Sequence, residues 1–237
     1  MGSDKRRKIG INRLWLDSGF IQEILQKGEE VKLKMFLEMA YPSSWNKKIF
    51  EALGSYSKRS QYCRQHLTRI VSGSGREVFK IDEEKALKLA YNIKGQAQNE
   101  QECSLSNDYM APESLMAKVF ECEKDSKWLE MELCRPATSK DFRDKFKIDY
   151  KNFSDILWYV GSEGKNKSDW AKEMLASFNE KDHWWFYELE QFIGDFGYPI
   201  GDLTRKNSWG VTKDGRLVIV DYGLSSDVYS THYQRKR

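Results

Sequence analysis

Three oxygen-bearing side chains near one end of the sequence have types and spacing that could support chemistry. Asn207 follows Asp202 by five residues, and Asp221 begins the tripeptide Asp221-Tyr222-Gly223. Carboxylate and amide oxygens are hard ligands of the kind magnesium prefers, and a carboxylate can also accept a proton from a hydroxyl group. Each aspartate has a plain structural alternative as well, because Asp202 could cap a turn and Asp221 could end a strand.

A predicted β-hairpin separates these residues. Two apolar runs, 209–212 and 216–220, flank a Lys-Asp-Gly turn at 213–215, and Asp-Gly in that setting predicts a hairpin. The order of Asp, Asn, hairpin and Asp-aromatic-Gly resembles the catalytic and metal-binding loops of protein-kinase-like enzymes. The resemblance implies a two-lobed α+β fold that binds ATP and Mg²⁺, with Asp202 as the catalytic aspartate and Asn207 and Asp221 as metal ligands.

The same resemblance requires partners upstream: a glycine-containing turn, a lysine on the third strand and a glutamate on the next helix. Gly73-Ser74-Gly75 fits the turn but lacks a third glycine, so an ordinary tight turn is the alternative. Lys88, flanked by apolar residues, would reach the phosphates and share in catalysis, or would simply face outward. Glu102 is favoured over Glu100 as its partner, and a solvated acidic helix is the alternative.

The resemblance extends to a hinge and covers about residues 67–225. The segment 128–136 resembles the strand and hinge between the lobes, where backbone groups from Glu132 to Cys134 would meet an adenine edge. The similarity is closest to small, divergent kinase-like proteins of phage and bacterial type. Residues 1–66 match no named family and form a predicted helical extension, followed by an N-lobe at 67–134 and a C-lobe at 135–237.

Three departures from the protein-kinase pattern stand out. Ile200-Gly201 precedes Asp202 where eukaryotic protein kinases have His-Arg, a form more similar to aminoglycoside kinases. Tyr222 replaces the usual Phe. Only 14 residues follow Gly223, so we expect a truncated C-lobe with no Ala-Pro-Glu segment.

The expected order of elements is helices, a small sheet, helices and the hairpin. Residues 11–69 have helical spacing, with a break at 41–44 and a helix at 45–53 that Ser44 would cap and Gly54 would end. Apolar stripes at Leu14, Ile21 and Leu25, and at Leu33, Phe36 and Leu37, predict packing on the protein's own body or on a partner subunit. Three strands are expected within 67–91, a helix at 96–106, strands at 117–122 and 128–133, and helices within 150–197.

Composition restricts the remaining possibilities. The net charge of +3 is too small to argue for nucleic-acid binding, and the basic runs at 5–8 and 235–237 are expected to be solvated tails or, alternatively, contacts to phosphate or an acidic partner. The sequence shows no zinc-ligand spacing, signal peptide or apolar run of membrane-spanning length. Four scattered cysteines predict reduced thiols in a cytoplasmic compartment: Cys63, Cys103, Cys122 and Cys134. The resemblance to phage and bacterial proteins implies that this is the cytoplasm of a bacterium or an infected host cell.

Two functions remain open. One is an ATP- and Mg²⁺-dependent phosphotransferase that acts on protein side chains, which the combined presence of Lys88, Asp202, Asn207 and Asp221 favours. The other is a pseudokinase-like module that uses the fold as an interaction surface, which the short C-lobe favours. Nucleic-acid binding through the basic tails is a third, less favoured function.

Overall fold

The computed structural model describes residues 44–162 and 168–234, so the predicted apolar stripes before residue 44 and both basic runs lie outside the described residues. The chain divides into two compact units, 1–55 and 56–237. In the first unit, α3 (Lys47–Ala52) buries Ile49 and Phe50. Its cap is Asn46, whose side chain accepts a hydrogen bond from the Ile49 amide, and not Ser44 as predicted. Ser44 lies two residues too early to reach that amide. The helix ends at Ala52 and its C-cap is Leu53, one residue before the predicted Gly54.

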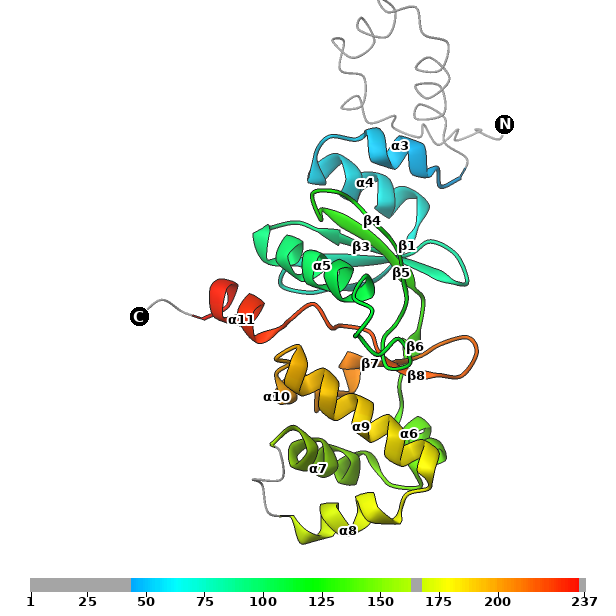
Figure 1. Ribbon diagram of the computed structural model, residues 1–237. Helices are drawn as coiled ribbons and strands as arrows, with labels where there is room; N and C mark the ends of the chain where they lie inside the picture. The colour runs from blue at the N-terminus through cyan, green and yellow to red at the C-terminus, as the bar shows by residue number, and fades with distance from the viewer. Residues whose placement is uncertain (1–43, 163–167, 235–237) are drawn as a thin grey trace, which may run out of the picture. The chain divides into compact units, whose positions relative to one another are not determined.

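The second unit contains a five-stranded antiparallel sheet in the order β1-β2-β3-β5-β4 (Figure 1). The strands confirm the three predicted within 67–91 and the two predicted after the helix. Their bounds are β1 Thr68–Ser72, β2 Arg76–Lys80, β3 Lys85–Ala90, β4 Val119–Cys122 and β5 Trp128–Glu132. The helical region before the sheet ends with α4 (Tyr56–His66), so it does not continue to residue 69.

Two helices contact opposite faces of this sheet. Successive strand residues point to opposite faces, so Arg76 and Glu77 on β2 diverge. Arg76 reaches α5 (Ile93–Ser106), whereas Glu77 reaches α4. Helix α5 begins three residues earlier than the predicted Gln96, because the Asn92 side chain caps it by accepting a hydrogen bond from the Gly95 amide.

The helical part follows the sheet and surrounds a core rich in aromatic rings. The Phe153 ring lies 4.7 Å from Phe142 and 5.4 Å from Trp209, between ring centroids. Trp185 and Phe186 also belong to this core. Among its described residues, the region predicted to be helical at 150–197 contains α7, α8 and α9, whereas α6, α10 and α11 were not predicted. The bounds are α6 Ser139–Phe146, α7 Tyr150–Gly161, α8 Asp169–Ser177, α9 Glu180–Asp195, α10 Ile200–Leu203 and α11 Ser226–His232.

The predicted hairpin is present in a second, three-stranded sheet. Strands β7 (Trp209–Val211) and β8 (Leu217–Ile219) pair antiparallel, and β6 (Arg135–Pro136) pairs with β7. Gly215 in the turn has φ +89°, a conformation that glycine adopts without strain. The expected α+β architecture, with a small antiparallel sheet and several helices, is therefore confirmed. No helix among the described residues is long and apolar enough to span a membrane.

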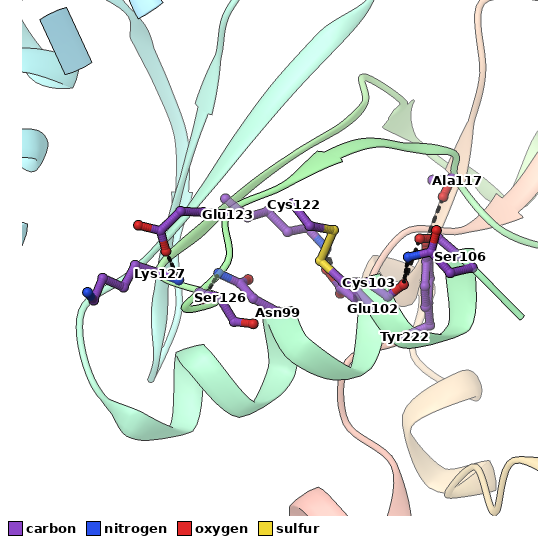
Figure 2. The surroundings of a disulfide bond; sticks show 12 residues. Asn99, Glu102, Cys103, Ser106, Ala117, Cys122, Glu123, Ser126, Lys127 and Tyr222 are labelled. Atoms are coloured by element: carbon purple, nitrogen blue, oxygen red, sulfur yellow. Dashed lines mark hydrogen bonds and ion pairs between the residues drawn. A yellow bond between two sulfur atoms is a disulfide. The ribbon is translucent and has the colours of Figure 1, made fainter. Parts of the chain in front are cut away.

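A disulfide contradicts the prediction of reduced thiols. Cys103 on α5 and Cys122 at the end of β4 are bonded, with their Cα atoms 6.1 Å apart (Figure 2). Their separation of 19 residues matched no sequence motif, and only the packing of α5 beside β4 brings them together. Cys63 and Cys134 are free thiols, and burial raises the pKa of each to about 12.

Candidate active site

The site is built around an ion pair between β3 and α5. The Lys88 ammonium lies 2.8 and 2.9 Å from the two carboxylate oxygens of Glu102, and both side chains are buried. Glu102, and not Glu100, is thus the helix residue beside Lys88. Burial lowers the pKa of Lys88, an effect that Glu102 opposes. The pair fixes the position of α5 against the sheet.

Lys88 also connects the sheet to the end of the hairpin. Its ammonium donates a third hydrogen bond, of 2.7 Å, to the carbonyl oxygen of Val220. Asp221 is the next residue, so the predicted phosphate-binding lysine and the predicted metal ligand are adjacent in space although 133 positions separate them in the sequence. The two parts of the predicted site are therefore brought together.

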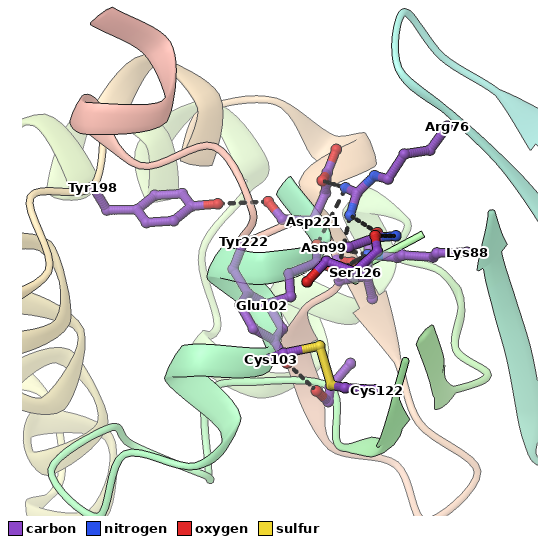
Figure 3. Close-up of polar contacts among 12 residues, drawn as sticks. Arg76, Lys88, Asn99, Glu102, Cys103, Cys122, Ser126, Tyr198, Asp221 and Tyr222 are labelled. Atoms are coloured by element: carbon purple, nitrogen blue, oxygen red, sulfur yellow. Dashed lines mark hydrogen bonds and ion pairs between the residues drawn. A yellow bond between two sulfur atoms is a disulfide. The ribbon is translucent and has the colours of Figure 1, made fainter. Parts of the chain in front are cut away.

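Arg76 is a second cation in this cluster, and no sequence motif indicated it. Its guanidinium lies 2.9 Å from one oxygen of Glu102 and 2.5 Å from Oδ1 of Asp221 (Figure 3). It also donates a 3.1 Å hydrogen bond to Oδ1 of Asn99 on α5. A basic residue directly after the glycine turn, at the start of strand β2, was the available signal.

Asp221 is held from several sides yet remains accessible. Its side chain is 54% exposed, while the Tyr198 hydroxyl donates a 2.7 Å hydrogen bond to its backbone carbonyl. Partial burial raises the pKa of the Asp221 carboxyl, but Arg76 and Lys88 outweigh this effect, so the pKa lies below its ordinary value. Asp221 is therefore a carboxylate with an exposed side.

Tyr222 and Gly223 lock the rest of the tripeptide in place. The buried Tyr222 hydroxyl donates a 2.8 Å hydrogen bond to the carbonyl of Ala117. Gly223 lies so close to α5 that an added Cβ would come within 2.5 Å of the Gln98 carbonyl oxygen. Glycine is required there because any side chain would push the tripeptide away from α5.

Asp202 lies on α10 in the loop that precedes the hairpin. The Ser208 hydroxyl donates a 2.6 Å hydrogen bond to the Asp202 carbonyl, and the Trp209 indole N–H donates one of 2.7 Å to the Leu203 carbonyl. These two hydrogen bonds fix the loop. Burial raises the pKa of the Asp202 carboxyl, Arg205 at 3.1 Å lowers it, and the charge of Asp221 raises it further.

Asn207 is exposed on the 3₁₀ turn η2 (Lys206–Ser208). Among the described residues, no hydrogen bond joins its side chain to Asp221. Its predicted role as a metal ligand stays a prediction.

The glycine turn is anchored to the start of α5. The carbonyls of Gly73, Ser74 and Gly75 accept hydrogen bonds from the Tyr91 hydroxyl, the Asn92 amide group and the Tyr91 backbone amide, respectively. An added Cβ on Gly95 would lie 2.0 Å from the Gly75 carbonyl oxygen, so both glycines permit a close backbone approach. A role of this turn in binding phosphate stays a prediction.

The predicted hinge also has its polar groups engaged. The amides of Glu132 and Leu133 donate 2.7 Å hydrogen bonds to the carbonyls of Lys118 and Glu84. The Glu132 carboxylate accepts two 3.0 Å bonds from Arg216. An adenine that docks at this segment would have to use other groups, such as the amide of Cys134.

The donor set restricts how a magnesium ion could bind. The described residues contain no group of three or more His, Cys, Asp or Glu side chains that could hold a metal. Magnesium commonly binds through one or two carboxylates together with substrate phosphates. The exposed side of Asp221 fits that mode, in which the nucleotide supplies the remaining ligands.

Comparisons with known proteins find similarity among solved structures. No protein-family model and no curated protein matches the sequence. The matched structures include the gentamicin complex of APH(2'')-IIa (13% identity, 76% of this chain, 70% of that chain, TM-score 0.38). Another is ADP-bound aminoglycoside phosphotransferase APH(2'')-Ib (13% identity, 69% of each chain, TM-score 0.34). At such scores the matches carry no argument about function.

The molecule's own geometry defines the fold. The small antiparallel sheet, the Lys88–Glu102 pair between β3 and α5, and the hairpin that delivers Asp221 beside Lys88 are together those of a protein-kinase-like fold. The resemblance seen in the sequence is confirmed at this level.

Proposed function

We propose that this chain binds ATP with Mg²⁺ and transfers the γ-phosphoryl group to a hydroxyl. The observation that carries the proposal is the convergence of Lys88, Glu102 and Asp221, with Asp202 in the loop that precedes the hairpin. Phosphoryl transfer depends mainly on positioning and charge stabilisation, which these groups can supply.

Each residue has a defined part in the proposed reaction. Lys88, oriented by Glu102, would hold the phosphates. Asp202 would accept the proton of the acceptor hydroxyl. The oxygen of that hydroxyl bonds to the γ-phosphorus while the bond from the γ-phosphorus to the β-phosphate oxygen breaks, which releases ADP. Asp221, with Asn207 as a second candidate, would hold Mg²⁺, which when bound supplies positive charge to the phosphates.

The acceptor is the least constrained part of the proposal. Protein side chains are the first acceptors to test, as the sequence predicts. Aminoglycosides, after which a matched phosphotransferase is named, serve as the small-molecule arm of the same assay.

A second candidate function is a pseudokinase-like binding module. It is favoured by the number of expected nucleotide contacts that already have partners within the protein. Asp221 contacts Arg76, the Gly73 amide donates a hydrogen bond to the Arg76 carbonyl, and the amides of Glu132 and Leu133 are used. Such a module would bind ATP weakly or not at all.

Ligand-dependent melting and labelled-phosphate transfer separate the two candidates. Ligand bound to the native state raises the melting temperature, so ATP with Mg²⁺ should do so and EDTA should remove most of the gain. Asp221→Asn should abolish the Mg²⁺-dependent part, whereas Asp214→Asn, an exposed aspartate on the same hairpin, should keep it. No shift at millimolar ATP contradicts the proposal. A shift without transfer of the γ-phosphate to protein or aminoglycoside favours the binding module.

A further inference from the structure

Arg76 is the feature of the site that the proposed roles do not use. Its side chain is 7% exposed and lies at the start of β2. One guanidinium contacts Glu102 on α5, Asn99 on α5 and Asp221 after the hairpin. A planar guanidinium with several fixed donors suits such bridging, which a lysine could not reproduce.

The charges of the cluster show what Arg76 contributes. Arg76 and Lys88 face the carboxylates of Glu102 and Asp221, so the four formal charges cancel. The nearby Asp202 carboxylate has its own partner in Arg205. Without Arg76, a single lysine would face two carboxylates, one of them half exposed. That arrangement would attract a divalent cation, because opposite charges at contact distance in a partly buried site interact strongly.

We propose that Arg76 is a positioning residue that takes the place of a metal ion at Asp221 while no nucleotide is bound. It holds Asp221 against α5 and keeps free divalent cations from the site. This inference rests on the proposed function, in which Asp221 is the metal ligand. Cation binding then requires the nucleotide, whose phosphates add the negative charge that Arg76 has neutralised.

The test measures Mn²⁺ binding to the nucleotide-free protein from the loss of the free-ion electron paramagnetic resonance signal. Wild type should bind Mn²⁺ weakly. Arg76→Gln should bind it at least about tenfold more tightly, because a unit charge is removed beside the carboxylate. The double variant Arg76→Gln/Asp221→Asn should return to the wild-type affinity. As a control, Arg69→Gln removes an exposed arginine from the Glu77 side of the sheet and should leave the Mn²⁺ affinity unchanged.

Several outcomes would overturn the proposal. One is a Mn²⁺ affinity of Arg76→Gln that equals that of wild type. Another is a gain in Mn²⁺ affinity that persists in the double variant. Arg76→Lys keeps the charge and should stay within about threefold of wild type, so a gain as large as that of Arg76→Gln also contradicts it.

Two features keep the test decisive. If Arg76→Gln fails to fold by circular dichroism, wild type and Asp221→Asn decide, because tight Mn²⁺ binding by wild type that Asp221→Asn abolishes would overturn the proposal. No nucleotide is present in these titrations. A failure of Mg·ATP to bind would therefore contradict the proposed function without altering the Mn²⁺ result.

Discussion

Arg76 and Glu77 are neighbours on β2, yet they organise buried charge clusters of different character on opposite faces of the sheet. Glu77 accepts 2.6 Å hydrogen bonds from the hydroxyls of Tyr56 and Ser60 and from the guanidinium of Arg64. These partners come from α4, so all lie within about two dozen residues of Glu77 in the sequence. The Glu77 carboxylate is 2% exposed.

The cluster around Arg76 draws on distant parts of the chain and ends in an accessible group. Arg76 and Asp221 are 145 positions apart, and the Asp221 side chain is half exposed.

Burial raises the pKa of Glu77, but its hydrogen bonds from Ser60, Tyr56 and Arg64 outweigh this and lower the pKa to about 2. A carboxylate with no exposed side cannot contact a ligand directly, whereas a carboxylate with an exposed side can. We therefore expect substitutions on the α5 face to alter function and those on the α4 face to alter stability.

The largest expected effect is on phosphoryl transfer. If the α5 face and its hairpin carry the reaction, Asp202→Asn should lower the transfer rate by ~10²–10⁴-fold, as removal of a general base commonly does. ATP affinity and the melting temperature should remain nearly unchanged, since Asp202 would contact only the acceptor. Single-turnover transfer and ATP titration measure these quantities. Equal transfer by the variant and wild type would contradict the role given to Asp202.

On the α4 face, Glu77→Gln should lower the free energy of unfolding by about 3 kcal/mol, because it removes the charged acceptor of the hydrogen bonds from Tyr56 and Ser60. Urea denaturation measures this change. Glu83→Gln, on an exposed glutamate that pairs with Lys80, should change stability by less than about 0.5 kcal/mol. A loss of ATP binding in a folded Glu77→Gln protein would erase the proposed division between the faces.

The pH dependence of stability tests the same carboxylate. Because the folded-state pKa of Glu77 is about 2 and its ordinary value is 4.5, its contribution is complete above pH 4.5 and is lost as the pH falls toward 2. The stability difference between wild type and Glu77→Gln should therefore shrink across that interval. A difference that stays constant down to pH 2 would show that Glu77 does not titrate as its hydrogen bonds indicate.

The disulfide gives an effect of similar size on the α5 face. Cys103 is the residue after Glu102, so its bond to β4 helps hold α5 in place. Cys103→Ser/Cys122→Ser should lose roughly 3 kcal/mol of stability, since the bond closes a loop of moderate length. Reductant should destabilise wild type similarly and leave the double variant unaffected. Wild-type stability that does not respond to reductant would argue against the bond.

The smallest effect concerns the support of Asp221. Tyr198→Phe removes one hydrogen bond to the Asp221 carbonyl and should cost about 1 kcal/mol of stability. Tyr187→Phe, on an exposed tyrosine, should change stability by less than about 0.5 kcal/mol. If both variants match wild type in denaturation, the Tyr198 bond contributes nothing to holding the site.

The sequence by itself determined the features that depend on local patterns. Alternating apolar strands, the Asp-Gly turn and the spacing of Asp202, Asn207 and Asp221 predicted the sheet, the hairpin and the protein-kinase-like fold. They also placed Lys88 on a strand and Glu102 on the following helix, where the structure pairs them. Helix bounds were less certain, as α3 and α5 show, because side-chain caps decide where helices begin.

Only the tertiary structure decided which distant groups meet. The alternation along β2 places Arg76 and Glu77 on opposite faces of the sheet, but the sequence does not indicate which side chains contact each face. Asp221 reaches Arg76 because the hairpin delivers it beside the sheet, and Cys103 meets Cys122 because α5 packs beside β4. Contacts of this kind depend on the arrangement of whole elements in space, and short-range sequence patterns carry no record of that arrangement.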